Sequence, residues 1–127
     1  YFDEASIEII TSYGMPVGKT TFETCYYIGR VMEVMELHGK HCSPVSRMEV
    51  LQGFGIKGKG NKDSMLRATI ISKFAGGIGK KAVPGPLYGF VGSDMFSALA
   101  IAMWHHCIRD HKGTNIFLRE SFNYGRL

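Results

Sequence analysis

The fold is decided by Ala5-Ser-Ile-Glu-Ile-Ile-Thr11 together with the loop and the long apolar stretch that follow it. The segment is short, β-branched and apolar except for Glu8, which predicts a buried strand. Two glycines and a proline in Ser12–Lys19 predict a loop. From Thr20 to His38 apolar residues recur at helical spacing, which predicts a helix. Strand, loop and helix in this order predict an α/β fold class.

The predicted helix over 20–38 is apolar around much of its circumference. The apolar residues are Phe22, Cys25, Tyr26, Tyr27, Ile28, Val31, Met32, Val34 and Met35. A one-sided surface helix needs only a single apolar stripe. We therefore expect this helix to be either deeply buried or half of a dimer interface.

The rest of the chain continues the alternation of strands and helices. Gly39 is expected to end the first helix, Asn61 to cap the second, and Ser93 or Asp94 to cap the third. The expected elements are a strand at Pro44–Leu51, a loop at Gln52–Gly60, a helix at Asn61–Phe74, a long loop at Ala75–Gly92, a helix at Ser93–Asp110 and a short strand at Asn115–Leu118.

Length and composition favour one globular domain over residues 1–127, with 45% hydrophobic residues and a formal net charge of +4. This charge favours an anionic partner. Three cysteines without CxxC spacing argue against a disulfide framework and favour a reducing, cytoplasmic setting. No apolar run is long enough to span a bilayer, so no membrane partner is expected. Because the chain opens at Tyr1, close to a core strand, we expect a fragment or a processed product.

Glu8 is the first candidate functional residue, because it is a carboxylate within the apolar run Ile7-Glu8-Ile9. Burying a carboxylate costs several kcal/mol unless a cation or hydrogen-bond donors compensate. Simple alternation is the other explanation, in which Glu8 lies on the solvated side of a half-exposed strand.

Asp94 is the second candidate, at the start of an almost wholly apolar helix. It could be no more than a helix cap. If that helix start packs against the end of the first strand, Asp94 meets Glu8, and two close carboxylates are commonly held together by a divalent ion. Phosphodiester hydrolysis by two metal ions needs such a cluster, which activates the water and stabilises the leaving oxygen.

A basic segment is the third feature. Seven basic residues, against the single acid Asp63, lie between positions 57 and 81: Lys57, Lys59, Lys62, Arg67, Lys73, Lys80 and Lys81. Its first part, Gly53-Phe-Gly-Ile-Lys-Gly-Lys-Gly-Asn-Lys62, lets backbone N–H groups and lysines approach phosphates. A solvated basic loop is the alternative.

The stretch Gly14-Met-Pro-Val-Gly18-Lys19-Thr20 looks like a phosphate-binding P-loop between a strand and a helix. That motif needs four residues between its glycines, and this chain has three. A nucleotide-binding protein therefore stays a minor alternative.

Four stretches together resemble the RuvC-type Holliday-junction resolvases of the ribonuclease H-like superfamily, and the bacteriophage variants most closely. They are the acidic strand and helix over Ile7–Arg30, the strand and Gly/Lys loop over Glu49–Asp63, the lead-in Pro84-Gly-Pro-Leu-Tyr-Gly-Phe-Val-Gly-Ser-Asp94, and the acidic helix Asp94-Met-Phe-Ser-Ala-Leu-Ala-Ile-Ala-Met-Trp-His105. The resemblance covers roughly residues 5–107.

The resemblance implies a mixed sheet flanked by helices and an endonuclease that resolves branched DNA with Mg²⁺, or with Mn²⁺ as the alternative. It implies Glu8 and Asp94 as catalytic and metal-binding carboxylates, and a homodimer with two active sites for a four-way junction. The expected DNA contacts are Lys19, Lys57, Lys59 and Lys62, and the expected dimer contacts are Phe22, Tyr26, Ile28 and Met32.

The chain also departs from the family pattern. Family members begin with a strand that carries an Asp in an Asp-Pro-Gly-like setting, and no such segment is present, so the first three strands of the sheet are expected to be missing. Ser97 stands where many relatives have the last Asp. At most two of the four usual carboxylates are identified, and the alternative is a non-catalytic nucleic-acid-binding remnant of the same fold.

Overall fold

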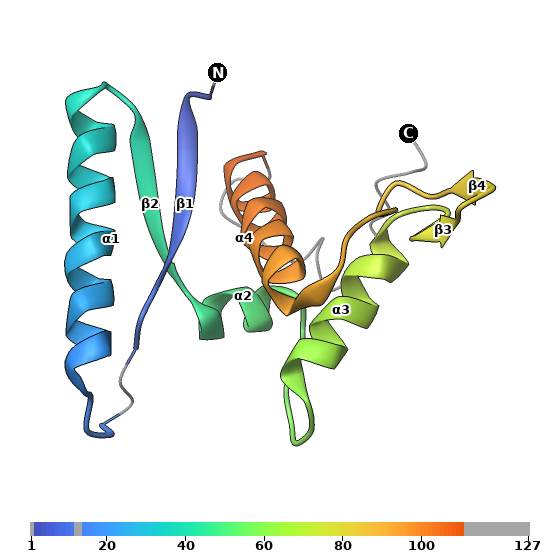
Figure 1. Cartoon of the computed structure of the whole chain (residues 1–127), viewed down its shortest axis with the longest axis horizontal. Coiled ribbons are helices and arrows are strands. Elements are labelled where there is room, and N and C mark those ends of the chain that lie inside the picture. The colour runs from blue at the N-terminus through green and yellow to red at the C-terminus, as the bar shows by residue number, and fades with distance from the viewer. Residues whose placement is uncertain (1, 12–13, 111–127) are drawn as a thin grey trace. The chain divides into compact units, whose positions relative to one another are not determined.

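The computed structural model describes residues 2–11 and 14–110, and these divide into two compact units, Tyr1–Glu49 and Val50–Leu127. The described residues form four helices and four short strands, so the chain belongs to the mixed α/β class (Figure 1). None of the described helices is both long and apolar enough to cross a bilayer. The expected strand at Asn115–Leu118 lies outside the described residues.

The first unit is a parallel β-α-β arrangement. Strand β1 spans Glu4–Ile9, helix α1 Lys19–Leu37 and strand β2 His41–Ser46. The two strands pair in parallel with Glu4 opposite His41 and Ile9 opposite Ser46. Between them α1 ends at a turn in which Gly39 has φ +72°, a backbone conformation that glycine adopts without strain. The predicted first strand and first helix are therefore confirmed.

Helix α1 differs from one of its two expected settings. None of its residues is buried, so the prediction of a deeply buried helix is wrong. Thr21, Ile28, Met32 and Met35 are half-buried, and the side chains on the remaining faces are exposed. A sheet of two strands is too narrow to cover an apolar helix of 19 residues.

The prediction of a strand over Pro44–Leu51 is wrong in its second half. Strand β2 ends at Ser46, and helix α2 spans Arg47–Gly53. The Ser46 hydroxyl oxygen accepts a hydrogen bond of 3.2 Å from the Glu49 backbone N–H, which caps the start of α2. Ser46 and Glu49 stand three residues apart, which is the spacing of a capping box, so this helix start was visible in the sequence.

The second unit contains helix α3, Lys62–Lys73, and helix α4, Gly92–Asp110, which pack against each other. Asn61 caps α3 as predicted, because its side-chain oxygen accepts a 3.1 Å hydrogen bond from the Ser64 N–H. Helix α4 begins one residue earlier than expected, so Ser93 and Asp94 lie within its first turn rather than at its cap. The core of the second unit contains Leu66, Ile70, Phe96, Ala100 and Met103.

The segment expected to be a long loop contains a hairpin. Strand β3, Gly79–Lys80, pairs antiparallel with strand β4, Val83–Pro84. Both strands are exposed, while Leu87, just beyond them, is buried. Glycine and proline predicted an irregular loop here, but the glycines instead allow close backbone packing.

Candidate functional site

Glu8 lines a hollow at the carboxyl end of β1. The hollow has a volume of about 310 Å³ and is lined by Glu8, Ile9, Ile10, Thr11, Thr24, Ile28 and Arg47. The parallel pairing places Ile9 opposite Ser46, so the residues that follow both strands meet at the same edge of the sheet. Ligands of open α/β sheets commonly bind at this edge.

The alternation of β1 places Glu8 on the opposite face of the strand from Ile7. Ile7 lines a hollow against α1, and Glu4, Ser6 and Glu8 share the other face because side chains alternate along a strand. All six residues of β1 are half-buried. Glu8 is therefore half-buried, which lies between the buried and the solvated settings that the sequence left open for it.

Arg47 was missed as a candidate from the sequence. It is the first residue of α2 and is one of the residues that line the same hollow as Glu8, so an arginine and a glutamate lie at this end of the sheet. Two threonines, Thr11 and Thr24, line it as well. A carboxylate, an arginine and hydroxyl groups are suited to a phosphate-bearing ligand that also carries a cation.

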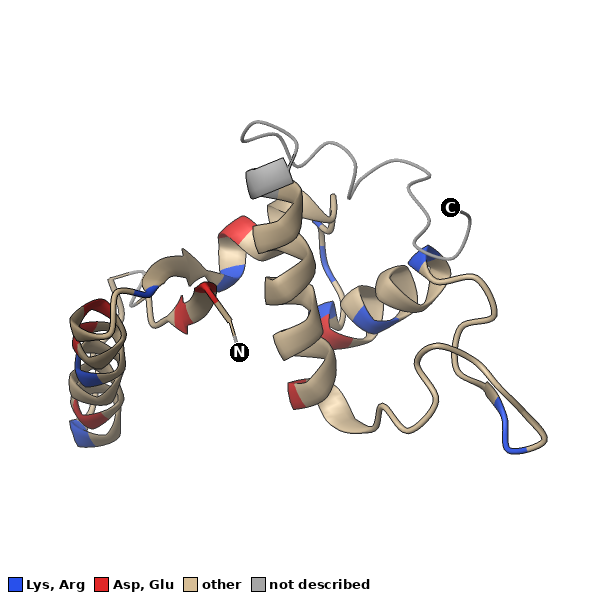
Figure 2. Ribbon diagram, turned by 90° about the horizontal axis from the view of Figure 1, so that it is seen from above, with Lys and Arg blue, Asp and Glu red and all other residues tan. Residues whose placement is uncertain are grey.

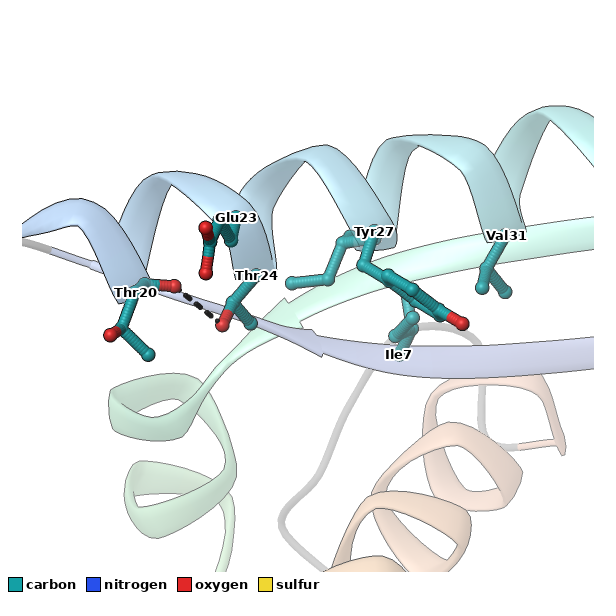
Figure 3. A pocket seen from close by; sticks show the side chains of 7 residues that line it. Ile7, Thr20, Glu23, Thr24, Tyr27 and Val31 are labelled. Atoms are coloured by element: carbon teal, nitrogen blue, oxygen red, sulfur yellow. Dashed lines mark hydrogen bonds between the residues drawn. The ribbon is translucent and has the colours of Figure 1, made fainter.

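A second hollow, mostly apolar in its lining, lies beside the first, between α1 and β1. Its volume is about 340 Å³, and Figure 3 shows Tyr27 and Val31 of α1 lying close to Ile7 of β1. The Thr24 hydroxyl donates a hydrogen bond of 2.9 Å to the Thr20 carbonyl oxygen of the same helix (Figure 3). This hollow is a gap that remains because α1 packs incompletely on the sheet, and it is not a polar site.

Asp94 lies in the second unit, within the first turn of α4, and is exposed. A carboxylate there is stabilised by the positive end of the helix dipole. Two residues further on, Phe96 is buried, 5.9 Å from the Phe90 ring and 5.2 Å from the Arg67 guanidinium carbon. This packing holds the first turn of α4 to its unit. Because Glu8 and Asp94 belong to different units, their predicted convergence stays a prediction.

The residues expected to hold a metal fit it only in part. Over residues 2–11 and 14–110, no group of three or more His, Cys, Asp or Glu side chains is placed to hold a metal ion. The hollow at Glu8 supplies one carboxylate. Mg²⁺ in phosphate-processing sites is commonly held by one or two carboxylates plus the phosphates of the substrate. Glu8 suits one ligand position, and a second carboxylate would have to come from outside this hollow.

The predicted DNA-contacting lysines have different surroundings. Lys57 and Lys59 are exposed, on a loop anchored by the buried side chains of Phe54 and Ile56. The Lys62 ammonium donates to the Gly58 carbonyl oxygen and closes this loop. Lys19 lies in the other unit, with its nitrogen 3.6 Å from Glu23 Oε1, an exposed ion pair of small stabilising effect.

The four predicted dimer contacts do not share one face of α1. Phe22 and Tyr26 are exposed, whereas Ile28 lines both hollows beside β1 and Met32 is half-buried. The outward face of the helix combines Tyr26 with charged neighbours. The Arg30 guanidinium carbon, for example, lies 5.9 Å from the centre of the Tyr26 ring.

The two units differ in net charge. The charges can be read from the sequence, but their division appears only when the boundary between the units, after Glu49, is known. The first unit has four basic and seven acidic residues, a net charge of −3, and the second has eleven basic and four acidic residues, a net charge of +7. Such asymmetry is typical of a chain in which one part binds a polyanion.

No family model matches this chain, and no curated protein or solved structure shows significant similarity to it.

Proposed function

We propose that this chain is part of a Mg²⁺-dependent, structure-selective endonuclease that hydrolyses phosphodiester bonds of branched DNA, with the Holliday junction as substrate. The observation that supports this most is the hollow at the carboxyl end of β1, where Glu8 and Arg47 line one space. The parallel β-α-β unit around it is compatible with the ribonuclease H-like sheet that the sequence resembles.

In this proposal Glu8 and Asp94 are the metal-binding carboxylates, which requires them to meet in the working enzyme. The bound Mg²⁺, with Mn²⁺ as a substitute, supplies activation of the attacking water and stabilisation of the leaving oxygen. Arg47, in the same hollow as Glu8, is suited to a non-bridging phosphate oxygen because its guanidinium donates two parallel hydrogen bonds.

The basic second unit supplies the grip on the sugar–phosphate backbone. Lys57 and Lys59 are exposed on a loop whose two apolar side chains are buried, so their charges are presented from an anchored backbone. Lysine contacts to phosphates are independent of sequence and depend strongly on salt. This property suits an enzyme that selects a DNA shape rather than a base sequence.

A homodimer formed through α1 is the second part of the proposal. Figure 2 shows both acidic and basic residues along this helix. In an antiparallel pairing of two α1 helices centred on Tyr26, Glu23 would lie near Arg30 of the second copy, and Lys19 would lie near its Glu33. This self-complementary charge pattern, with exposed Phe22 and Tyr26 beside it, fits a two-fold interface between identical chains.

Cleavage of a fluorescent four-way DNA junction in the presence of Mg²⁺ tests the catalytic proposal. We expect Glu8→Gln and Asp94→Asn each to abolish cleavage while leaving junction binding in EDTA intact. Glu4→Gln is the matched control for Glu8→Gln. Glu4 lies on the same face of the same strand as Glu8, and the substitution removes the same charge. It is expected to cleave like the parent chain.

Two results would reject the proposal or narrow it. Junction binding without cleavage, unchanged by Glu8→Gln, would replace it with a non-catalytic nucleic-acid-binding role.

The dimer is tested separately by the molar mass in solution. Arg30→Glu should shift this mass to that of a monomer, and Glu23→Arg/Arg30→Glu should restore the dimer. A mass that none of these changes alters contradicts the α1 interface.

A further inference from the structure

The β3–β4 hairpin has a stem formed by close backbone packing. A Cβ atom added to Gly79, which has φ +71°, would collide with the Gly85 backbone N and the Val83 carbonyl oxygen. A Cβ atom added to Gly85 would collide with the carbonyl oxygens of Gly76 and Gly77. At these two positions any side chain would force the strands apart.

Hydrogen bonds tie this stem to the packed part of its unit. The Gly85 N–H donates to the Ile78 carbonyl oxygen at 2.9 Å, and the Leu87 N–H donates to the Gly77 carbonyl oxygen at 3.0 Å. The Gly77 N–H in turn donates to the Phe74 carbonyl oxygen, just past the end of α3. Leu87 is only 2% exposed and anchors the returning chain. The hairpin is therefore a braced projection.

The outer end of this projection carries positive charge. Lys80 and Lys81 stand at its turn and are exposed, and Figure 2 shows the basic colour at the tip of this hairpin. Val83 beside them is 77% exposed, so no other described residue covers this end. No acidic residue occurs between positions 64 and 93. Two neighbouring ammonium groups are thus presented together without a nearby carboxylate in the sequence.

We infer that the β3–β4 hairpin is a preformed basic finger that contacts the sugar–phosphate backbone of nucleic acid. A braced backbone lowers the conformational entropy lost when the two lysines bind a rigid polyanion. The unit that carries the finger has a net charge of +7, which favours a partner of high negative charge density. The inference rests on the proposed function only for the partner's class, nucleic acid, and does not require cleavage.

The salt dependence of binding tests the finger. Binding of the full chain to a fluorescent four-way junction and to a linear duplex is titrated in EDTA at several salt concentrations. Loss of each phosphate contact should make the slope of log K against log[salt] shallower by about 0.9. Lys80→Ala/Lys81→Ala is therefore expected to weaken binding several-fold at low salt, and Lys80→Arg/Lys81→Arg to retain the parent slope.

The control for net charge is Lys40→Ala, compared with Lys81→Ala. Both remove one positive charge, but Lys40 belongs to the acidic first unit, where its nitrogen lies 3.8 Å from Asp3. The slope should change for Lys81→Ala and not for Lys40→Ala. Equal changes of slope in both variants, or no change in either, would overturn the finger. Binding to anionic phosphatidylserine vesicles is measured for the same variants, and a loss confined to the vesicles would also overturn it.

The outcomes separate this inference from the proposed function. In one outcome, the finger variants show a shallower slope of log K against log[salt] and yet the chain never cleaves DNA. That result would support the finger and contradict the proposed nuclease activity. Cleavage that depends on Glu8, with an unchanged slope for the finger variants, removes the finger alone. A chain that binds no nucleic acid at all overturns both.

Discussion

The two units of this chain differ in both packing and charge. Of the buried hydrophobic residues among the described positions, Cys42 and Val45 belong to the first unit and the other ten to the second. The first unit has a net charge of −3 and the second +7. Of the two carboxylates proposed for catalysis, Glu8 thus lies in the sparsely packed acidic unit and Asp94 in the well-packed basic one, which also carries the proposed DNA-contacting lysines Lys57 and Lys59.

This difference suggests a division of roles. Lysines gain little from binding a phosphate backbone if the loops that carry them must first be ordered. The Lys57–Lys59 loop and the β3–β4 hairpin are both anchored by buried side chains, namely Phe54, Ile56 and Leu87. Helix α1, by contrast, leaves large apolar side chains such as Phe22 and Tyr26 exposed, and a second copy of the chain would cover these two in the proposed dimer.

The largest expected effect comes from a matched pair of leucines. Leu66 in α3 is 1% exposed, and Leu37 at the end of α1 is 77% exposed. We expect Leu66→Ala to lower the free energy of unfolding by about 2–5 kcal/mol, because it leaves a cavity. Leu37→Ala should change it by no more than about 0.5 kcal/mol. Urea denaturation followed by circular dichroism measures both, and equal losses would contradict the packing difference.

A matched pair of glycines sharpens the comparison. Gly39 and Gly79 have nearly the same φ, +72° and +71°, but a Cβ atom would meet open space at Gly39 and backbone atoms at Gly79. Gly39→Ala should cost only the left-handed strain, about 1–2 kcal/mol. Gly79→Ala adds the steric clash, about 1–3 kcal/mol more. Similar stability losses in the two variants would show that the hairpin stem is not tightly packed.

The cysteines of the first unit give a pH-dependent contrast. Cys25 is exposed and Cys42 is buried. Burial raises the pKa of the Cys42 thiol, and the negative charge of Glu36 raises it further. At neutral pH Cys42 should therefore react with a thiol reagent far more slowly than Cys25.

The same shift sets the sign of a stability effect. Because the folded-state pKa of Cys42 lies above its unfolded value of about 9.0, its contribution to stability is present below that pH. It is lost as the pH rises through the folded pKa. Peptide mass spectrometry of the labelled thiols measures the rates, and faster labelling of Cys42 than of Cys25 would contradict its burial.

The smallest expected effect concerns helix caps. Helix α3 has a side-chain cap from Asn61, whereas α1 begins after Gly18, which provides none. Asn61→Ala should cost about 1 kcal/mol of stability. Gly18→Asn should stabilise by a few tenths of a kcal/mol, since Gly18 has extended backbone and open space around it. Thermal unfolding of both variants checks the prediction, and a destabilising Gly18→Asn would oppose it.

Local sequence patterns located much of the secondary structure. The apolar run around Glu8, the helical spacing from position 20 and the cap at Asn61 predicted β1, α1 and α3 nearly to their ends. The same local approach missed α2, because apolar residues after Pro44 fit a strand as well as a helix. The capping pair Ser46 and Glu49 was the signal that separates the two.

The candidate site was predicted less completely than the elements. Glu8 was singled out because a carboxylate in an apolar strand is unusual, and it lines a hollow. Arg47 was missed because only the parallel register of β1 and β2 brings the residue after β2 to the end of β1. The hairpin was missed because glycine and proline predict irregular backbone, while its existence depends on contacts between Gly79 and Gly85.

The sequence alone determined the α/β class, the strand that carries Glu8, the long apolar helix that follows it, and the excess of positive charge. These follow from periodicity, caps and composition, which act over a few residues. Only the tertiary structure decided that Arg47 shares a hollow with Glu8, that Lys80 and Lys81 stand on a braced hairpin, and that the charge divides between two units. Such features depend on contacts between residues distant in the chain, which local preference does not specify.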